Sequence, residues 1–101
     1  RLVPLDGVDW VPRDVEEALF PHPGVLLAAL VGIPNPGGGA TPIAFVTERP
    51  GQTVDPVALK SAIAPLLPYD LTTLVIRKAT SLPMTPTGKI AKATLAAEAA
   101  A

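Results

Sequence analysis

The stretch Val25-Leu26-Leu27-Ala28-Ala29-Leu30-Val31-Gly32-Ile33 is the longest apolar run in this sequence. Its residues suit a helix as well as a strand, but Pro21-His22-Pro23-Gly24 before it and the Gly-rich segment 34–41 after it limit it to strand length. It is also far shorter than a membrane span of roughly 20 residues. A continuous apolar strand is typical of a sheet that is covered on both faces. The run therefore predicts a sheet between two packing layers.

On the N-terminal side of this run, the sequence predicts a β-hairpin and a helix. Residues 2–5 and 8–11 are strand-like segments on either side of Asp6-Gly7, a pair that favours a tight two-residue turn. Pro12 then suits the first position of a helix. The helix has an apolar stripe at Val15, Ala18 and Leu19. Three acids near its start, Asp14, Glu16 and Glu17, are interpreted as groups that favour the helix dipole and remain solvated.

On the C-terminal side, the pattern alternates between strands and helices. Asp55 before Pro56 predicts a helix start, with Leu59, Ile63 and Leu66 on one face and Pro65 near the helix end. The other expected elements are a second strand over residues 43–47, a third strand over 72–77, and an alanine-rich helix over 90–100.

Together these elements predict an α+β fold in one small domain over residues 1–101. An N-terminal hairpin (residues 1–11) is followed by a three-stranded sheet flanked by helices (residues 12–101), with a loop at 82–90. Only four of the 101 residues are aromatic, so the core is expected to be built mainly from aliphatic side chains.

Composition excludes several classes of function. The formal net charge is −1, which gives no electrostatic footprint for nucleic acid or an anionic membrane. There is no cysteine and one histidine, so disulfides, thiolate catalysis and a Cys/His metal cluster are excluded. The chain opens at Arg1 without methionine, and we expect it to be a piece of a longer protein with the cytoplasm as its default location.

The segment Leu82-Pro83-Met84-Thr85-Pro86-Thr87-Gly88-Lys89-Ile90 carries the chemistry. A lysine on such a loop presents a compact positive charge that suits a developing carboxylate–phosphate anion. Thr85 and Thr87 are candidate hydrogen-bond donors, and Gly88 lets a ligand approach the backbone. The segment is not a P-loop, because Pro83 replaces the required first glycine and Ile90 the required Ser or Thr. Taken alone, the Gly88-Lys89 pair is also compatible with a solvated lysine near a helix start.

This segment, followed by Lys92 and Leu95, closely resembles the C-terminal signature of the adenylate-forming superfamily of acyl-CoA synthetases, adenylation domains and luciferases. The resemblance continues through Pro12-x-Asp14-Val15-Glu16, His22-Pro23-x-Val25, and the segments 28–34 and 44–46. The chain departs from the family at Asp14, where Glu is usual, and at Gly37-Gly38-Gly39-Ala40, where the family usually has Gly-Glu.

The resemblance implies a lid domain that closes over a larger N-terminal adenylation domain of the same polypeptide. That domain would hold ATP and Mg²⁺, and the chain alone would be inactive. Lys89 would serve formation of the acyl-adenylate. After the lid rotates, the hairpin turn of Asp6, Gly7, Val8 and Asp9 would line the approach of the thiol of CoA or of a carrier-protein pantetheine. The family often has a second glycine at position 6 and Asn or Arg at position 9.

Two other readings stay open at this level. One is a stand-alone lid-like binding module that docks on a carrier protein or a partner ligase, and the other is a small α+β domain with an accidental signature. Lys89 favours the ligase reading, because docking does not require an ammonium at that point. The carboxylic acid itself remains open, since the family binds it in the other domain.

Overall fold

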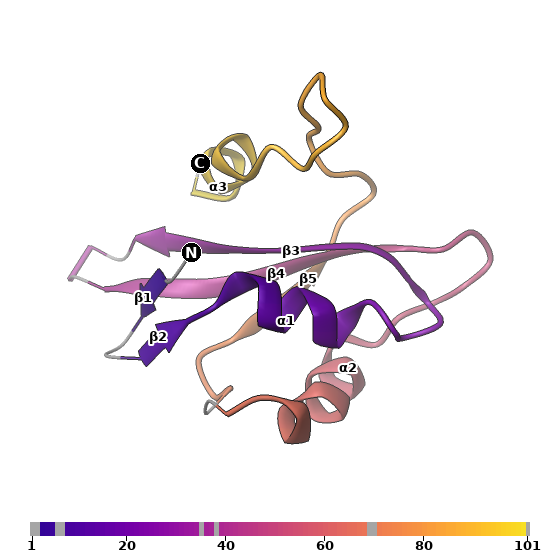
Figure 1. Ribbon diagram of the computed structural model, residues 1–101, viewed down its shortest axis with the longest axis horizontal. Coiled ribbons are helices and arrows are strands. Elements are labelled where there is room, and N and C mark those ends of the chain that lie inside the picture. Colours follow the sequence, from indigo (N-terminus) through magenta and orange to yellow (C-terminus); the bar gives the residue numbers. More distant parts are fainter. Residues whose placement is uncertain (1–2, 6–7, 35, 38, 69–70, 101) are drawn as a thin grey trace.

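The computed structural model describes residues 3–5, 8–34, 36–37, 39–68 and 71–100. Within these residues the chain forms a two-stranded hairpin and a three-stranded sheet, and helices cover both faces of the larger sheet (Figure 1). The predicted α+β architecture is confirmed.

The hairpin consists of β1 (Val3–Leu5) and β2 (Val8–Trp10), which pair antiparallel with Leu5 opposite Val8. Both strands lie where the sequence predicted them. The connecting residues Asp6 and Gly7, on which the turn prediction rests, lie outside the described residues. Strand β1 lies against β4 of the larger sheet.

The larger sheet has the order β3-β4-β5. Strands β3 (Val25–Pro34) and β4 (Ala40–Glu48) are antiparallel, and β5 (Val75–Lys78) runs parallel to β4. The decisive apolar run is thus an edge strand. A bulge between Val25 and Leu27 shifts its register, and the buried Thr47 hydroxyl accepts the Leu27 N–H there at 3.1 Å.

The two remaining strand predictions need corrected bounds. Strand β4 starts three residues earlier than expected, because Pro42 pairs with Gly32 before β5 begins beside Ile43, and a proline is tolerated where no third strand adjoins it. Strand β5 starts three residues later than residue 72. A turn forms instead, in which the Leu74 N–H donates to the Leu71 carbonyl.

Helix α1 (Pro12–Leu19) and helix α2 (Pro56–Ile63) cover one face of the sheet. Pro12 stands at the predicted first position, and the Asp55 carboxylate caps α2 by accepting the Val57 N–H at 3.0 Å. The core of this face is aliphatic and comprises Val15, Leu19, Val25, Ala28, Leu30, Ala44, Val46, Val54, Leu59, Ile63, Leu71, Leu74 and Ile76.

The prediction that Leu66 lies on the same face of α2 as Leu59 and Ile63 is wrong. The α-helix ends at Ile63 and continues as the 3₁₀ turn η1 (Ala64–Leu66), which contains Pro65. Because a 3₁₀ turn has about 3.0 residues per turn rather than 3.6, the stripe rotates away from the core. Leu66 is 66% exposed.

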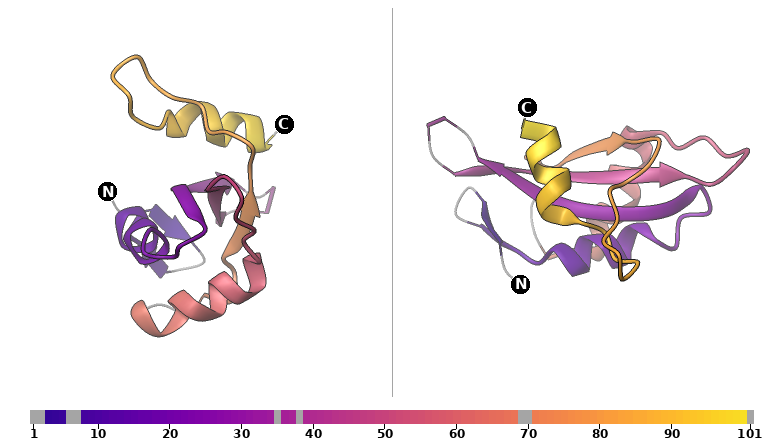
Figure 2. Two further views of the ribbon diagram at one scale, coloured as in Figure 1. Left: turned by 90° about the vertical axis from the view of Figure 1, so that its right-hand side faces the viewer. Right: turned by 90° about the horizontal axis from the view of Figure 1, so that it is seen from above.

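Helix α3 (Lys92–Ala100) covers the opposite face. Figure 2 shows α3 and the segment before it on one side of the sheet, with α1 and α2 on the other. Ala29, Val31, Ile43 and Phe45 of the sheet pack there against Leu82 and Leu95. The predicted covering on both faces is confirmed. The helix begins two residues later than expected, because Ile90 forms a bridge with Met84 instead.

Candidate functional site

The predicted catalytic loop forms a short hairpin, here called the lysine hairpin (residues 84–90). Met84 and Ile90 form an antiparallel bridge, the Thr85 N–H donates to the Lys89 carbonyl at 2.6 Å, and the Gly88 N–H donates to the Thr85 carbonyl at 3.0 Å. Pro86 stands at the second position of this turn, where its fixed φ is favoured. The local sequence therefore builds the hairpin with its own backbone bonds.

Thr85 and Thr87 fasten the turn. Their hydroxyl oxygens lie 2.9 Å apart, and Thr85 Oγ1 also accepts the Lys89 N–H at 3.2 Å. These contacts restrict the backbone of Lys89 on both sides. The expectation that the two hydroxyls donate to a ligand stays a prediction.

Gly88 adopts φ +85°, which other residues reach only with strain. A Cβ placed there would meet no atom of the described residues within 4 Å. Glycine is therefore required by backbone conformation and not by a lack of space, and the outer side of the turn is open.

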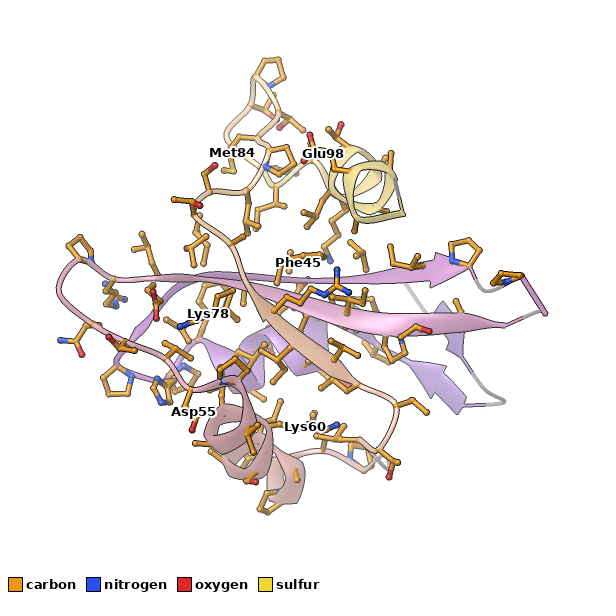
Figure 3. All side chains as sticks on the ribbon, turned by 180° about the vertical axis from the view of Figure 1, so that it is seen from behind. Phe45, Asp55, Lys60, Lys78, Met84 and Glu98 are labelled. Atoms are coloured by element: carbon orange, nitrogen blue, oxygen red, sulfur yellow. The ribbon has the colours of Figure 1, made fainter. Side chains whose placement is uncertain are left out.

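Lys89 is exposed, and its ammonium has no hydrogen-bond or ion-pair partner among the residues that the structure describes. Figure 3 shows the loop that carries Met84 standing off the sheet, beside the helix that carries Glu98. The structure thus holds the backbone of Lys89 in a tight turn while its charge is available to a group outside the described residues.

The base of the lysine hairpin is anchored to the face of the sheet that α3 covers. Leu82, just before the hairpin, is buried with Leu95 of α3. The Ala91 N–H donates to the Pro83 carbonyl at 2.8 Å, which ties the two ends of the segment together.

Glu16 was interpreted as a solvated residue, and this is wrong. Its side chain is 15% exposed, its Oε2 accepts the Leu30 N–H of β3 at 2.8 Å, and the same oxygen lies 2.6 Å from Nζ of Lys92. Its neighbour Glu17 does face solvent, in a 2.8 Å pair with Arg13. The available signals were that Glu16 flanks Val15 of the apolar stripe and that Lys92 belongs to the signature.

The Glu16–Lys92 pair lines a groove of about 360 Å³ between α1, the outer edge of β3 and α3. It is also lined by Leu30, Val31 and Gly32 of β3 and by Ala93 and Ala96 of α3. The groove is small and aliphatic apart from the charges of Arg13, Glu16 and Lys92.

Among the described residues, two charged groups have displaced pKa values. The pKa of Glu48 is lowered, first by the Val54 N–H that its carboxylate accepts at 2.7 Å and further by Lys78. The pKa of Arg13 is raised by its hydrogen bond and charge interaction with Glu17. Both effects belong to structural contacts, one at the end of β4 and one on the surface of α1.

The predicted thiol-side residues lie elsewhere. Val8 and Asp9 are in β2, opposite Leu5 and Pro4, whereas Asp6 and Gly7 lie outside the described residues. Figures 1 and 2 show the N-terminal hairpin near one end of the sheet and the lysine hairpin well apart from it. The structure therefore does not bring the two predicted groups into one site.

The described part of the chain offers neither a membrane-spanning helix nor a cluster of metal-binding side chains. Its helices include none long and apolar enough to cross a bilayer. Among the same residues, no three His, Cys, Asp or Glu side chains are grouped to hold a metal ion.

Comparison with known proteins gives the chain a family. A model described as the AMP-binding enzyme C-terminal domain matches residues 14–89. Sulfoacetate–CoA ligase of Cupriavidus necator is 37% identical over 90 residues, which is 89% of this chain and 18% of that protein. Acetyl-coenzyme A synthetase of Deinococcus radiodurans is 38% identical over 77 residues, or 76% of this chain and 12% of that protein.

The fold agrees with these matches. An acyl-CoA synthetase from Brucella canis superposes with a TM-score of 0.84 at 33% identity, covering 97% of this chain and 19% of that structure. The chain thus spans less than a fifth of the length of each of these three relatives. It belongs to the AMP-binding enzyme C-terminal domain family, as found in acyl-CoA synthetases of the adenylate-forming superfamily.

Proposed function

We propose that this chain is the mobile C-terminal lid of an AMP-forming acid–thiol ligase that acts with an N-terminal adenylation domain of the same polypeptide. The observation that carries the proposal is Lys89. Its ammonium is exposed and unpartnered among the described residues, on a turn whose backbone is fastened, inside the segment that matches the family. A charge held in this way is suited to a ligand supplied by another domain.

In the first half-reaction, a carboxylate oxygen attacks the α-phosphorus of ATP, the bond to the bridging oxygen breaks, and pyrophosphate leaves. Negative charge on the phosphoryl oxygens and the carboxylate is brought together in this step. Lys89 stabilises that charge electrostatically and transfers no proton. Thr85, Thr87 and Gly88 hold the turn that delivers it.

In the second half-reaction, a pantetheine thiolate attacks the acyl carbon and AMP leaves. We assign Asp6, Gly7, Val8 and Asp9 to the side of the lid that faces this thiol, with CoA as the acceptor. The separation of the two hairpins supports a lid that uses different surfaces in the two steps. A rotation of the lid between the steps would then exchange Lys89 for the N-terminal hairpin.

The remaining chemistry is assigned to the other domain. We assign Mg²⁺ and most of the ATP to the N-terminal domain, because the family model that matches this chain describes the C-terminal domain of AMP-binding enzymes. The 101-residue chain would be inactive alone. The use of ATP and CoA favours the cytoplasm as the location.

The test is Lys89→Ala in the full-length protein. Loss of one preorganised charge contact is worth roughly 3–4 kcal/mol, so ATP–pyrophosphate exchange should fall by a factor on the order of 10²–10³ or more. Thioester formation from supplied acyl-adenylate should change by less than about threefold, because Lys89 leaves the site before that step.

Lys78→Ala is the matched control, since Lys78 is a surface lysine paired with Glu48 at 3.4 Å. It should leave the exchange rate unchanged. A panel of carboxylic acids in the same assay would identify the acid. Equal losses in both half-reactions would contradict the division of roles, and a full-length protein that exchanges no pyrophosphate would favour the docking module.

A further inference from the structure

Glu16 and Lys92 connect two helices that lie on opposite faces of the sheet. Glu16 is on α1, and Lys92 is the first residue of α3. Their side chains meet beside the outer edge of β3, with Oε2 and Nζ 2.6 Å apart. The pair is therefore a direct link between the two layers that does not pass through the core.

The carboxylate of Glu16 is itself fixed to the sheet. The Leu30 N–H donates to it at 2.8 Å, and this N–H lies on the edge of β3 away from β4. The side chains of Glu16 and Lys92 are 15% and 43% exposed, so solvent screens this pair less than it screens the Arg13–Glu17 pair, whose side chains are 80% and 60% exposed. Through Glu16, Lys92 is thus held beside the edge of β3.

Lys92 is in turn coupled to the lysine hairpin by short backbone bonds. The Lys92 N–H donates to the Ile90 carbonyl at 3.0 Å, and Ile90 is the residue that bridges to Met84. The segment is also held by two other backbone bonds, Ala91 N–H to the Pro83 carbonyl and Leu95 N–H to the Ala91 carbonyl, and by the apolar contacts of residues such as Leu82 and Ile90. Apolar packing fixes the depth of the segment but is non-directional.

We propose that Glu16 and Lys92 are positioning residues that set the orientation of Lys89 toward the reacting carboxylate and phosphate. The inference rests on the proposed function and adds two residues to it. The ion pair fixes the start of α3 to the edge of β3, and the backbone bonds at Ile90 transmit this position to the turn. Since a misplacement of about 1 Å can cost 10²-fold in rate, a loosened anchor would lower the rate of adenylation.

The variants are chosen to separate orientation from folding. Glu16→Gln removes the charge but keeps an oxygen that accepts the Leu30 N–H. Lys92→Met removes the ammonium and keeps an apolar stem against the groove, whereas Lys92→Arg keeps a positive charge. Glu17→Gln is the matched control, because it is the same substitution one residue away on a side chain that is 60% exposed.

In the full-length protein, Glu16→Gln and Lys92→Met should each lower kcat for pyrophosphate exchange about 10-fold, within the range that misplacement can cause. The KM for ATP and thioester formation from supplied acyl-adenylate should stay within about twofold, because the proposal gives neither residue a contact with ATP or the thiol. Lys92→Arg should recover most of the rate, and Glu17→Gln should leave it unchanged.

A double-mutant cycle identifies the route of the effect. On a Lys89→Ala background, Glu16→Gln should have no further effect on exchange if it acts through Lys89. Multiplicative losses in the double variant would overturn the proposal. So would a Glu16→Gln variant with normal kcat, or one whose lower thermal midpoint is accompanied by equal losses in both half-reactions.

The result also separates this inference from the proposed function. If Lys89→Ala abolishes exchange while Glu16→Gln does not alter it, only the positioning role fails. If Lys89→Ala leaves exchange intact, the proposed function fails. Should Lys92→Met not fold, Glu16→Gln still decides the question, because it retains the bond to β3.

Discussion

At the scale of single residues, the lysine hairpin depends on the backbone of Gly88. Gly88 and Gly51 share the left-handed conformation, with φ of +85° and +78°, and a Cβ at either position would meet no atom within 4 Å among the described residues. The two glycines are therefore equivalent in local strain and differ in what they support. One closes the turn that holds Lys89, and the other lies in the loop after β4.

Gly88→Ala should strain the backbone by about 1 kcal/mol and disturb the turn, because a Cβ disfavours the left-handed region. We expect pyrophosphate exchange by the full-length protein to fall about 10-fold through misplacement of Lys89. Gly51→Ala carries a similar strain and should leave exchange unchanged. Equal rates for the two variants would show that the turn does not orient Lys89.

At the scale of elements, α2 depends on a side-chain cap. Asp55 accepts the Val57 N–H, and Pro56 follows at the first helical position. Helix α1 also has a proline at its start, but its N-cap is Val11, which makes no side-chain cap bond to the helix. Helix α2 therefore has a side-chain cap that α1 lacks, and this cap supports the helix whose Leu59 and Ile63 are buried in the core.

Asp55→Ala should destabilise the chain by about 1 kcal/mol, because it leaves the Val57 N–H without its cap. Asp55→Asn should retain most of the stability, since asparagine caps about as well. Urea unfolding at neutral pH measures both. Equal losses for the two substitutions would mean that the charge of Asp55, rather than the cap geometry, stabilises the helix.

At the scale of the whole molecule, stability comes from a sheet packed on both faces. The side of α1 and α2 holds most of the fully buried large side chains, including Leu19, Leu30 and Leu59. The side of α3 has a smaller cluster around Phe45, Leu82 and Leu95. The larger cluster stabilises the fold, and the smaller one seats the segment that carries Lys89.

Leu59→Ala should cost about 2–5 kcal/mol in the free energy of unfolding, because Leu59 is 1% exposed and its loss leaves a cavity. Leu66→Ala is the matched control, as the same substitution on a largely exposed side chain should change stability by less than about 0.5 kcal/mol. Urea unfolding of the 101-residue chain compares them. A small cost for Leu59→Ala would show that the core relaxes around the deletion.

Much of the fold and of the site could be predicted from local sequence. Apolar runs, Pro at helix starts, the Asp55 cap and the signature around Lys89 act through neighbouring residues or short periodicities. They placed both strands of the hairpin, the two-sided sheet and the catalytic candidate. The hydrogen bonds that fasten the turn of Lys89 also lie within residues 84–90.

The tertiary structure decided what depends on distant contacts. Pairing with β3 made β4 longer than the local pattern predicted. A 3₁₀ turn exposed Leu66, which the local pattern had placed on the apolar face of the helix. Above all, it paired Glu16 with Lys92, residues far apart in sequence on opposite faces of the sheet. Sequence by itself determined the type and order of the main elements and singled out Lys89 as the candidate residue, because these follow from local backbone and side-chain preferences. Only the tertiary structure decided that Glu16 pairs with Lys92, because an ion pair across a sheet edge depends on how the layers pack.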